Sequence, residues 1–548
     1  MNVDGLLRRD ALVYFNKLSF VSPTEGSMHR HQPARSVWRE KVPKEITMRI
    51  DNLRLKNYRC FDSLSLKLHP QLTVLVAPNG HGKTSILDAV KVALWPYVAG
   101  FDLGSTTNDV TSIQIDDVFL ERVQTEQKAS SMEWRLPAQV NADGKLCVTQ
   151  LLQEGVFKTP QIERRYLEEP DPHVTFAEGL PWQITRFRES VRKGTKTKEI
   201  NPVGVLGIND TAQAFQQRIF TDRPGVPDDL PVLGYYGTGR LWAQKKLTSV
   251  HVETDPQSQS RTFAYRDCLD PFSSYKHFAI WFTRVHQAYL QAQIRNLERH
   301  LPLNAENAVE LSAPFKAVQN AIDKILRKHT GWGELAYNAE HEELVLHHDT
   351  HGVLKVSQLS DGIRSMLALV GDIAYRCYKL NNHLGMDAPT LTRGIVMIDE
   401  VDMHLHPSWQ QTVLSDLSAA FPKLQFIVTT HSPQVLTSIA SENIRILYRN
   451  RLNQWEALPP EQEIKGVESA VALNDIMRVN PIPPIDEANW LVEYTNKIEN
   501  HTYDDAEGRQ LRAKLVELYG ERHPVILDTD RLIRFQAFKL RKLNASKV

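Results

Sequence analysis

Residues 72–94 read LTVLVAPNGHGKTSILDAVKVAL, a short apolar run, a glycine-rich turn and a second apolar pattern at helical spacing. The run at 72–77 predicts a buried strand, and residues 86–94 predict a helix directly after the turn. Between them, Ala77–Thr84 fits the phosphate-binding loop GxxxxGK(S/T), except that alanine replaces the first glycine. Because Ala77 ends the strand, its methyl group can be tolerated. The stretch therefore predicts strand, phosphate loop and helix.

The loop residues suit phosphate and magnesium chemistry. Gly80 and Gly82 let backbone N–H groups converge on phosphate oxygens, Lys83 reaches the β- and γ-phosphates, and the Thr84 hydroxyl can bind Mg²⁺. The alternative is an ordinary glycine-rich turn before a helix, which the flanking elements disfavour. We expect ATP and Mg²⁺ here, with nucleotide contacts from Asn79, Gly80, His81, Gly82, Lys83, Thr84 and Ser85.

Two later apolar strands end in polar residues. Residues 395–400 read IVMIDE, so that Asp399 can hold Mg²⁺ and Glu400 can polarise water. Residues 424–433 read LQFIVTTHSP and deliver His431 to the same sheet edge, where open α/β sheets bind their ligands. Each of these motifs, taken alone, often occurs by chance. Together they make Glu400 and His431 catalytic candidates, and Thr84 and Asp399 metal-ligand candidates.

Residues 359–362 read LSDG and precede an apolar helix pattern at 366–375. In chain order, the phosphate loop, this signature, the acid pair, a D-loop at 401–402 and His431 resemble the ABC-type ATPase head. The resemblance implies an α/β P-loop ATPase head with a mixed sheet and nucleotide contacts from Ser360, Gly362 and Asp402. The long interval before the signature implies a large insertion, which transporter ATPases lack.

Two further stretches favour the soluble branch of these ATPases. Residues 50–61, IDNLRLKNYRCF, resemble the first strand of SMC, RecF and OLD-type ATPases, which implies that Arg59 lies near the nucleotide. The alternative is a basic residue on a solvated strand face. The HLHP run at 404–407 resembles the same group. A metal pair of His404 and His406 is disfavoured because no third ligand is nearby.

Stretches beyond the head motifs narrow the family. They lie at 234–240, 466–469, 474–477 and 481–484 and resemble the ATPase subunit (PtuA) of Septu antiphage systems, in its retron-associated form. The resemblance implies an ATPase that controls an HNH nuclease subunit (PtuB-like), with a reverse transcriptase and its DNA–RNA product as further partners. We also expect a homo-oligomer built on ATP-dependent head dimers, in which Lys83 and Thr84 of one subunit face Ser360 and Gly362 of the other.

The length of the chain bears on how many compact units it forms. With 548 residues the chain predicts more than one compact unit. We expect a poorly patterned extension at 1–47 and an ATPase head at 48–450. The head carries a β/helical insertion at about 105–340, with a helical hairpin at about 275–330. A mostly helical, partner-docking region follows at 451–548.

The charge and cysteine content exclude several protein classes. The 65 basic residues balance 65 acidic ones, so there is no global positive field for nucleic acid. Cys60, Cys147, Cys268 and Cys377 are too far apart for a CxxC zinc site or a disulfide scaffold. The chain shows no secretory signal and no apolar run long enough to cross a membrane, so we expect a soluble, cytoplasmic protein with no membrane partner.

Three other functions remain open at this point. An OLD-type ATP-dependent nuclease would use Asp528 and Asp530 as a DxD motif, but these acids fit charges near a helix start better. A RecF-like repair ATPase would bind DNA directly, and residues 531–548 carry six basic residues and no acid. A solvated helix face explains that run equally well. A slowly hydrolysing, ATP-gated scaffold would share every motif. We expect an ATPase that is not itself a nuclease.

Overall fold

The computed structural model describes residues 48–103, 111–124, 130–146, 180–202, 207–221, 227–240, 260–271, 275–299, 305–340 and 342–545. The extension predicted at 1–47 lies outside these residues. Most described hydrophobic side chains join one large core, which also includes Ile464, Ala472 and Ile476. A second, smaller core holds Tyr494, Ile498, Leu511, Leu515 and Ile526.

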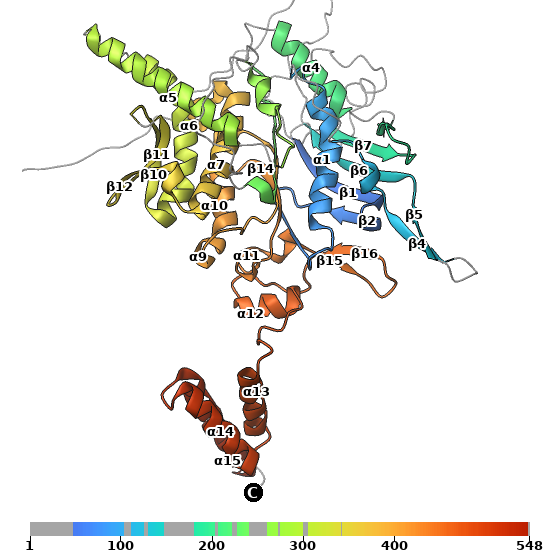
Figure 1. The fold of residues 1–548 in the computed structure, drawn as a ribbon, viewed down its shortest axis with the longest axis vertical. Coiled ribbons are helices and arrows are strands. Elements are labelled where there is room, and N and C mark those ends of the chain that lie inside the picture. The colour runs from blue at the N-terminus through green and yellow to red at the C-terminus, as the bar shows by residue number, and fades with distance from the viewer. Residues whose placement is uncertain are drawn as a thin grey trace, which may run out of the picture. The chain divides into compact units, whose positions relative to one another are not determined.

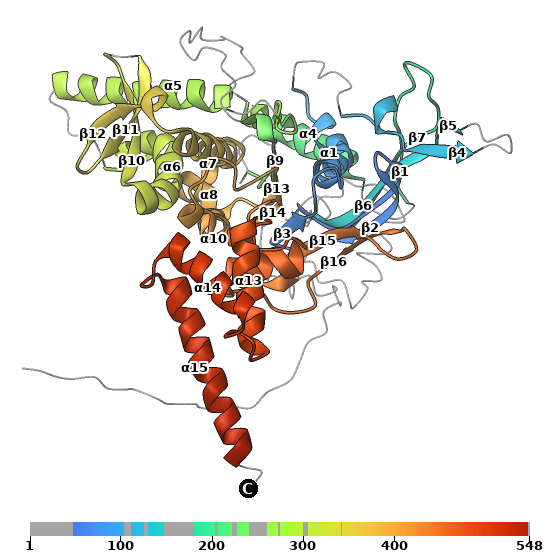
Figure 2. The same cartoon turned by 60° about the horizontal axis from the view of Figure 1, so that its bottom comes forward.

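A six-stranded sheet with strand order β16-β15-β3-β14-β13-β9 carries the predicted motifs; Figure 1 labels β14, β15 and β16, and Figure 2 labels all six strands. Strands β15, β3, β14, β13 and β9 are parallel and β16 is antiparallel, so the sheet is mixed. Four of the parallel strands are buried on both faces, which explains their continuous apolar runs. The strands are β3 (Leu72–Val76), β9 (Val232–Tyr236), β13 (Gly394–Ile398), β14 (Leu424–Thr429), β15 (Ile444–Arg449) and β16 (Trp455–Leu458).

A second, antiparallel sheet has the order β2-β1-β6-β7-β8. In β6 and β7 every second residue is buried, as expected when one face packs on a core. Helix α1 (Lys83–Ala99) contacts this sheet, the central strand β14 and helix α4 (Ile208–Thr221). The strands are β1 (Met48–Tyr58), β2 (Phe61–Lys67), β6 (Ala138–Leu146), β7 (Leu180–Arg188) and β8 (Lys198–Ile200); a separate ribbon pairs β4 (Leu120–Gln124) with β5 (Ser130–Trp134).

Helices α5, α6 and α7 pack against one another beside a small three-stranded sheet (Figure 2). Phe278 and Phe282 of α5 and Val318, Ile322 and Ile325 of α6 are buried at helical spacing. The elements are α5 (Tyr275–Glu298), α6 (Ala305–Thr330), β10 (Trp332–Asn338), β11 (Glu343–His348), β12 (Gly352–Lys355), α7 (Asp361–Leu380) and α8 (Ala388–Leu391).

The remaining helices are short or C-terminal. They are η1 (Ile115–Asp117), η4 (Thr238–Arg240), η6 (Arg261–Tyr265), η7 (Val356–Gln358), η8 (Asn382–Asp387), α9 (Pro407–Gln410), α10 (Val413–Ala420), α11 (Pro433–Leu436), η9 (Ser441–Asn443), α12 (Ser469–Val471), η10 (Ala472–Ile476), α13 (Asp486–Glu499), α14 (Ala506–Tyr519) and α15 (Pro524–Ala545). Helices α13, α14 and α15 build the smaller core. None of the helices in the described ranges combines the length and the apolar character that crossing a bilayer requires.

Candidate nucleotide site

The phosphate loop connects the end of β3 to the start of α1. Gly80 and Gly82 both have left-handed backbones, with φ of 79° and 83°. A Cβ on Gly82 would come within 2.5 Å of Cys60 Sγ and of the Phe61 ring, so this position needs glycine for space as well. The Lys83 ammonium donates to the carbonyls of Ala77 at 2.7 Å and Pro78 at 3.3 Å. The lysine is thus folded back over its own loop.

Lys83 lies close to three carboxylates. Burial lowers the pKa of Lys83, and the negative charges of Asp399, Glu400 and Asp402 partly oppose that shift. The residues come from the loop after β3 and from the residues after β13, which are separated in the sheet by β14. The fold therefore brings the phosphate loop and the predicted acids into one electrostatic cluster.

Asp399 links the phosphate loop to two neighbouring strands. Its carboxylate accepts hydrogen bonds from the Thr84 hydroxyl at 2.8 Å and from the Thr429 hydroxyl at 2.6 Å. Its backbone N–H donates to the Tyr236 carbonyl at the end of β9, at 2.8 Å. Hydroxyl and carboxylate oxygens are ligands that Mg²⁺ prefers, and such sites are commonly completed by substrate phosphates. The donor set of Thr84 and Asp399 therefore fits Mg²⁺.

Glu400 is held by its backbone. It has a left-handed φ of 48°, which is unfavourable for a residue with a Cβ, and its N–H donates to the Thr429 hydroxyl at 2.7 Å. The next residue, Val401, donates its N–H to the Thr429 carbonyl at 3.0 Å. Thr429 thus fixes both acids, a role that sequence reasoning missed because a threonine at a strand end carries no motif.

The end of β14 also positions Asp402 and His431. The Thr430 hydroxyl donates to Asp402 at 2.6 Å and accepts from the Ser432 N–H at 3.0 Å. The Ser432 hydroxyl in turn accepts from the Val435 N–H and caps α11. His431, between these two anchored residues, is partly exposed at the sheet edge that carries Asp399.

Ser360 and Gly362 lie at the start of α7. Ser360 is exposed and occupies the N-cap position. A Cβ on Gly362 would lie 2.5 Å from the His404 carbonyl oxygen, so the signature packs directly against the segment that follows the D-loop. The remaining predicted loop residues, Asn79, His81 and Ser85, stand in the turn and the first turn of α1.

Arg59 is held in an internal ion-pair network and not on a solvated strand face. Its guanidinium donates to Asp117 at 2.7 Å and to Asp88 of α1 at 2.6 Å. Burial would lower the pKa of Arg59, but the neighbouring Tyr58, Asp88 and Asp117 raise it above its ordinary value. Arg59 therefore ties the β1–β2 turn to the helix that follows the phosphate loop. The sequence did not predict that these two aspartates pair with Arg59, because neither lies in a recognisable motif.

Comparison with known families agrees with this geometry. A family model described as AAA domain matches residues 52–329, just over half of the chain. The chain belongs to the AAA domain family. A second AAA-domain model, named for the AbiEii toxin of a type IV toxin–antitoxin system, matches residues 276–437 of the ATPase.

Relatives of the ATPase include proteins named for retrons and a protein named for Septu. It is 26% identical over 520 residues to a retron Ec83 ATPase of Escherichia coli, covering 86% of this chain and 84% of the relative. It is 44% identical over 121 residues to a retron Vc95 ATPase of Vibrio cholerae, covering 22% and 23%. It is 42% identical over 96 residues to a Septu protein PtuA of Bacillus mycoides, covering 18% and 13%. The predicted resemblance to retron and Septu ATPases is confirmed.

Among solved structures, the SMC head domain from Thermotoga maritima is 14% identical, with a TM-score of 0.36, covering 76% of this chain and all of that chain. The Smc head domain from Pyrococcus furiosus, solved with an extended coiled coil and a bound ScpA domain, is 15% identical with a TM-score of 0.39, covering 76% and 96%. The predicted α/β class with a mixed sheet is confirmed by the strand pairing of the six-stranded sheet, in which β16 is the antiparallel edge strand.

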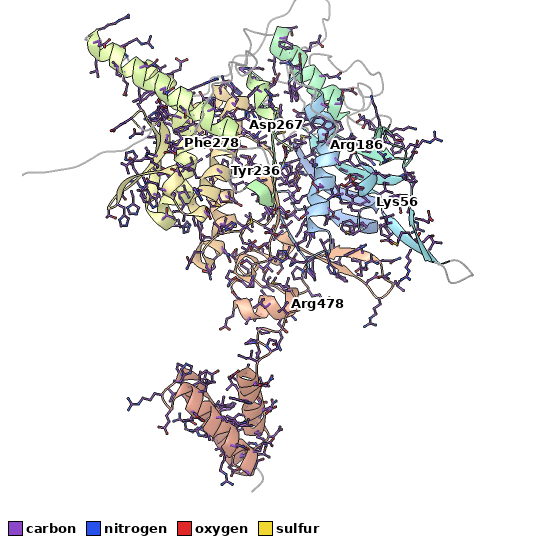
Figure 3. All side chains as sticks on the ribbon, in the orientation of Figure 1. Lys56, Arg186, Tyr236, Asp267, Phe278 and Arg478 are labelled. Atoms are coloured by element: carbon purple, nitrogen blue, oxygen red, sulfur yellow. The ribbon has the colours of Figure 1, made fainter. Side chains whose placement is uncertain are left out.

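A buried ion pair within α7, the signature helix of the ATPase, is hydrogen-bonded to β9. Asp372 and Arg376 of α7 pair at 2.7 Å, and their side chains are 0% and 2% exposed. Tyr236, which is labelled in Figure 3, also donates from its hydroxyl to Asp372, at 2.8 Å. Because the Tyr236 carbonyl receives the Asp399 N–H, α7 is linked through one residue to the strand end that carries the acids. No motif marked this network in the sequence.

The residues of the alternative sites have other partners. Asp530 pairs with Arg512 at 2.6 Å and Asp528 with Arg531 at 2.7 Å, and both acids lie inside α15. His406 caps α9 through Ser408. Within the described ranges, no group of three or more His, Cys, Asp and Glu side chains is arranged to hold a metal ion.

Proposed function

We propose that this ATPase hydrolyses ATP as the ATP-binding subunit of a cytoplasmic antiphage defence complex of the retron and Septu type. The observation that carries the proposal is the Asp399 carboxylate, which accepts hydrogen bonds from Thr84 of the phosphate loop and from Thr429 of β14. It joins three sequence motifs in one site. The retron and Septu relatives support the biological setting.

In this proposal the loop N–H groups and Lys83 bind the phosphates of ATP. Thr84 and Asp399 would hold Mg²⁺, which would neutralise charge on the β- and γ-phosphates. Glu400 orients and deprotonates the attacking water, and His431 contacts the γ-phosphate. Thr429 keeps Glu400 in place through the 2.7 Å hydrogen bond from the Glu400 N–H. Each of these roles needs only side chains that reach the same sheet edge.

We further propose that ATP joins two heads. Ser360 is exposed at the start of α7, where a second subunit can reach it. The N-terminus of a long helix favours a negatively charged group. Ser360 and Gly362 of one head would therefore complete the phosphate site formed by Lys83 and Thr84 of the other, with the D-loop residue Asp402 at the contact. The resulting homo-oligomer would be built from such dimers.

The nuclease activity is assigned to a partner. We propose an HNH nuclease subunit of the PtuB kind, together with a reverse transcriptase and its DNA–RNA product. The C-terminal region is the proposed docking site because α15 exposes Phe535 and Phe538, which are 60% and 63% exposed. Arg534 and Lys539 lie on the same helix and suit an acidic partner surface.

Purified full-length protein tests the enzymatic part of the proposal. The expected result is ATP hydrolysis, alone or with its partner proteins, that requires Mg²⁺ and is lost in Lys83→Ala. A matched control is Lys465→Ala, which removes an exposed lysine far along the sequence from the phosphate loop. Hydrolysis that is equal in wild type and Lys83→Ala would refute the proposed site.

A further inference from the structure

We propose that the guanidinium of Arg449 is a stacking platform for the purine base of the bound nucleotide. This inference rests on the proposed function, because it assumes that the phosphates occupy the loop at 77–84. It adds Arg449, from the β15–β16 hairpin, to a nucleotide site whose sequence motifs all lie in other segments of the chain. Two observations support it: a cavity beside the phosphate loop, and the contact between the Arg449 guanidinium and the Trp455 ring at the wall of that cavity.

The cavity is a shallow depression, widely open to solvent, of about 740 Å³, and it is lined by Arg59, Cys60, residues 116–120 and Arg449. One of its walls touches the phosphate loop, because a Cβ on Gly82 would lie 2.5 Å from Cys60 Sγ. A nucleotide with its phosphates on the loop would therefore have open space for its base on this side.

Trp455 forms the rigid backing of this wall. Its indole N–H donates to the Cys60 carbonyl at 3.0 Å. Its ring meets Phe61 and His81 edge-on, with centroid distances of 5.1 and 5.7 Å, and it is only 8% exposed. The tryptophan is thus fixed against both the β1–β2 turn and the phosphate loop, which sets the position of whatever lies on its face.

Arg449 lies on that face. Its guanidinium carbon is 4.7 Å from the centroid of the Trp455 ring, and one of its nitrogens donates to Asn453 at 2.9 Å. Arg449 is exposed and lines the cavity. A planar guanidinium with one face on an indole presents its other face outward, and such planes stack well on nucleobases.

The chemistry favours a base over a second anion. Asp116 and Asp117 line the cavity together with Arg59 and Arg449, so the lining carries as many acidic as basic side chains and offers no net positive charge to a second phosphate or an acidic peptide. A neutral, planar ring with an exocyclic amine suits both the cationic plane and the carboxylate acceptors. Stacking tolerates different bases, but a purine offers a larger ring face than a pyrimidine. We therefore expect purine nucleotides to bind more tightly than pyrimidine nucleotides.

The test compares two probes that differ by a nucleoside. Binding of Mg-ADP and of magnesium pyrophosphate to the full-length protein is measured by calorimetry for wild type, Arg449→Ala, Arg449→Lys and Arg451→Ala. We expect Arg449→Ala and Arg449→Lys to weaken ADP binding about tenfold and to leave pyrophosphate binding unchanged. Arg451, exposed two residues away, controls for charge alone, so Arg451→Ala should bind both probes like wild type.

The outcomes separate the two proposals. If Arg449→Ala weakens both probes equally, or weakens neither, the stacking platform is refuted while the phosphate site stands. If Arg449→Lys binds ADP like wild type, charge explains the effect and stacking is refuted. If wild type binds neither probe, or if Lys83→Ala binds both normally, the proposed function itself fails.

Discussion

The Thr84 hydroxyl donates a 2.8 Å hydrogen bond to the Asp399 carboxylate, across 315 positions of sequence. The contact joins the first turn of α1 to the end of β13. It exists because β14 lies between β3 and β13, so that all three strands end at one edge. The pairing of these strands therefore brings a phosphate loop and an acid pair to within hydrogen-bond distance.

Glu400→Gln should keep ATP binding and slow hydrolysis by about 10²–10⁴-fold. The amide preserves the shape of the side chain and removes the base, while the backbone bond to Thr429 remains. Steady-state phosphate release and nucleotide binding check the two halves of this prediction. Unchanged turnover in Glu400→Gln would exclude Glu400 as the base.

Arg376→Met should destabilise the fold by about 3–5 kcal/mol, because it leaves the Asp372 carboxylate buried without its ion-pair partner. Tyr236→Phe should cost only about 1 kcal/mol, since Asp372 keeps Arg376. Urea unfolding of both variants measures the difference. Equal losses in the two variants would show that the buried pair contributes no more than a single neutral hydrogen bond.

Lys379→Met should stabilise the protein at pH 7 and lose that advantage at higher pH. Burial lowers the pKa of Lys379 to about 8, below its ordinary value. Between that pKa and the ordinary value, the unfolded chain binds more protons than the folded chain, so wild-type stability rises with pH. The melting-temperature difference between variant and wild type should therefore shrink from pH 7 to pH 10. A constant difference, or a similar trend in the exposed control Lys465→Met, would contradict the assignment.

The isolated chain should not cleave DNA or RNA with ATP and Mg²⁺ or Mn²⁺. Asp528 and Asp530 are engaged in ion pairs within the C-terminal helices, and no metal cluster occurs in the part of the chain that the structure describes. Cleavage that disappears in Asp528→Ala would instead support an OLD-type nuclease. The assay needs only purified protein and labelled oligonucleotides.

A truncation after Asn480 should lose the proposed HNH partner in a pull-down and keep ATP binding. The main core includes Ile464, Ala472 and Ile476, so a cut at residue 451 would damage the head, whereas this cut removes only α13, α14 and α15. A milder variant, Phe535→Ser with Phe538→Ser, should weaken capture without unfolding the small core. Full partner capture by both variants would place the docking surface elsewhere.

The sequence indicated the parts of the site that are local in the chain. A continuous apolar run precedes each of three parts of the site: the phosphate loop, the acid pair and His431. Such runs can be recognised in the sequence because parallel strands are buried on both faces. The sequence did not predict the roles of four other residues, Thr429, Tyr236, Asp88 and Asp372. They depend on which strands become neighbours, and nothing in the residues around β9 indicates that it pairs with β13.

The extent of the head was also hard to see. Residues 455–458 look like the start of a new region, yet they form β16 at the edge of the central sheet. A four-residue edge strand has too few residues for a periodic pattern. Its importance comes from Trp455, whose contacts with Phe61 and His81 are non-local.

The central claim is that each ATP site is shared by two heads. The most direct measurement is ATP hydrolysis in mixtures of Lys83→Ala and Ser360→Arg subunits, with heterodimers verified by differential tags. Each variant alone should be inactive, while Ser357→Arg, an exposed change in the preceding η7, should remain active. Mixing should restore hydrolysis, because each mixed dimer pairs an intact phosphate loop with an intact signature. No hydrolysis in any mixture, with heterodimers present, would contradict a shared site.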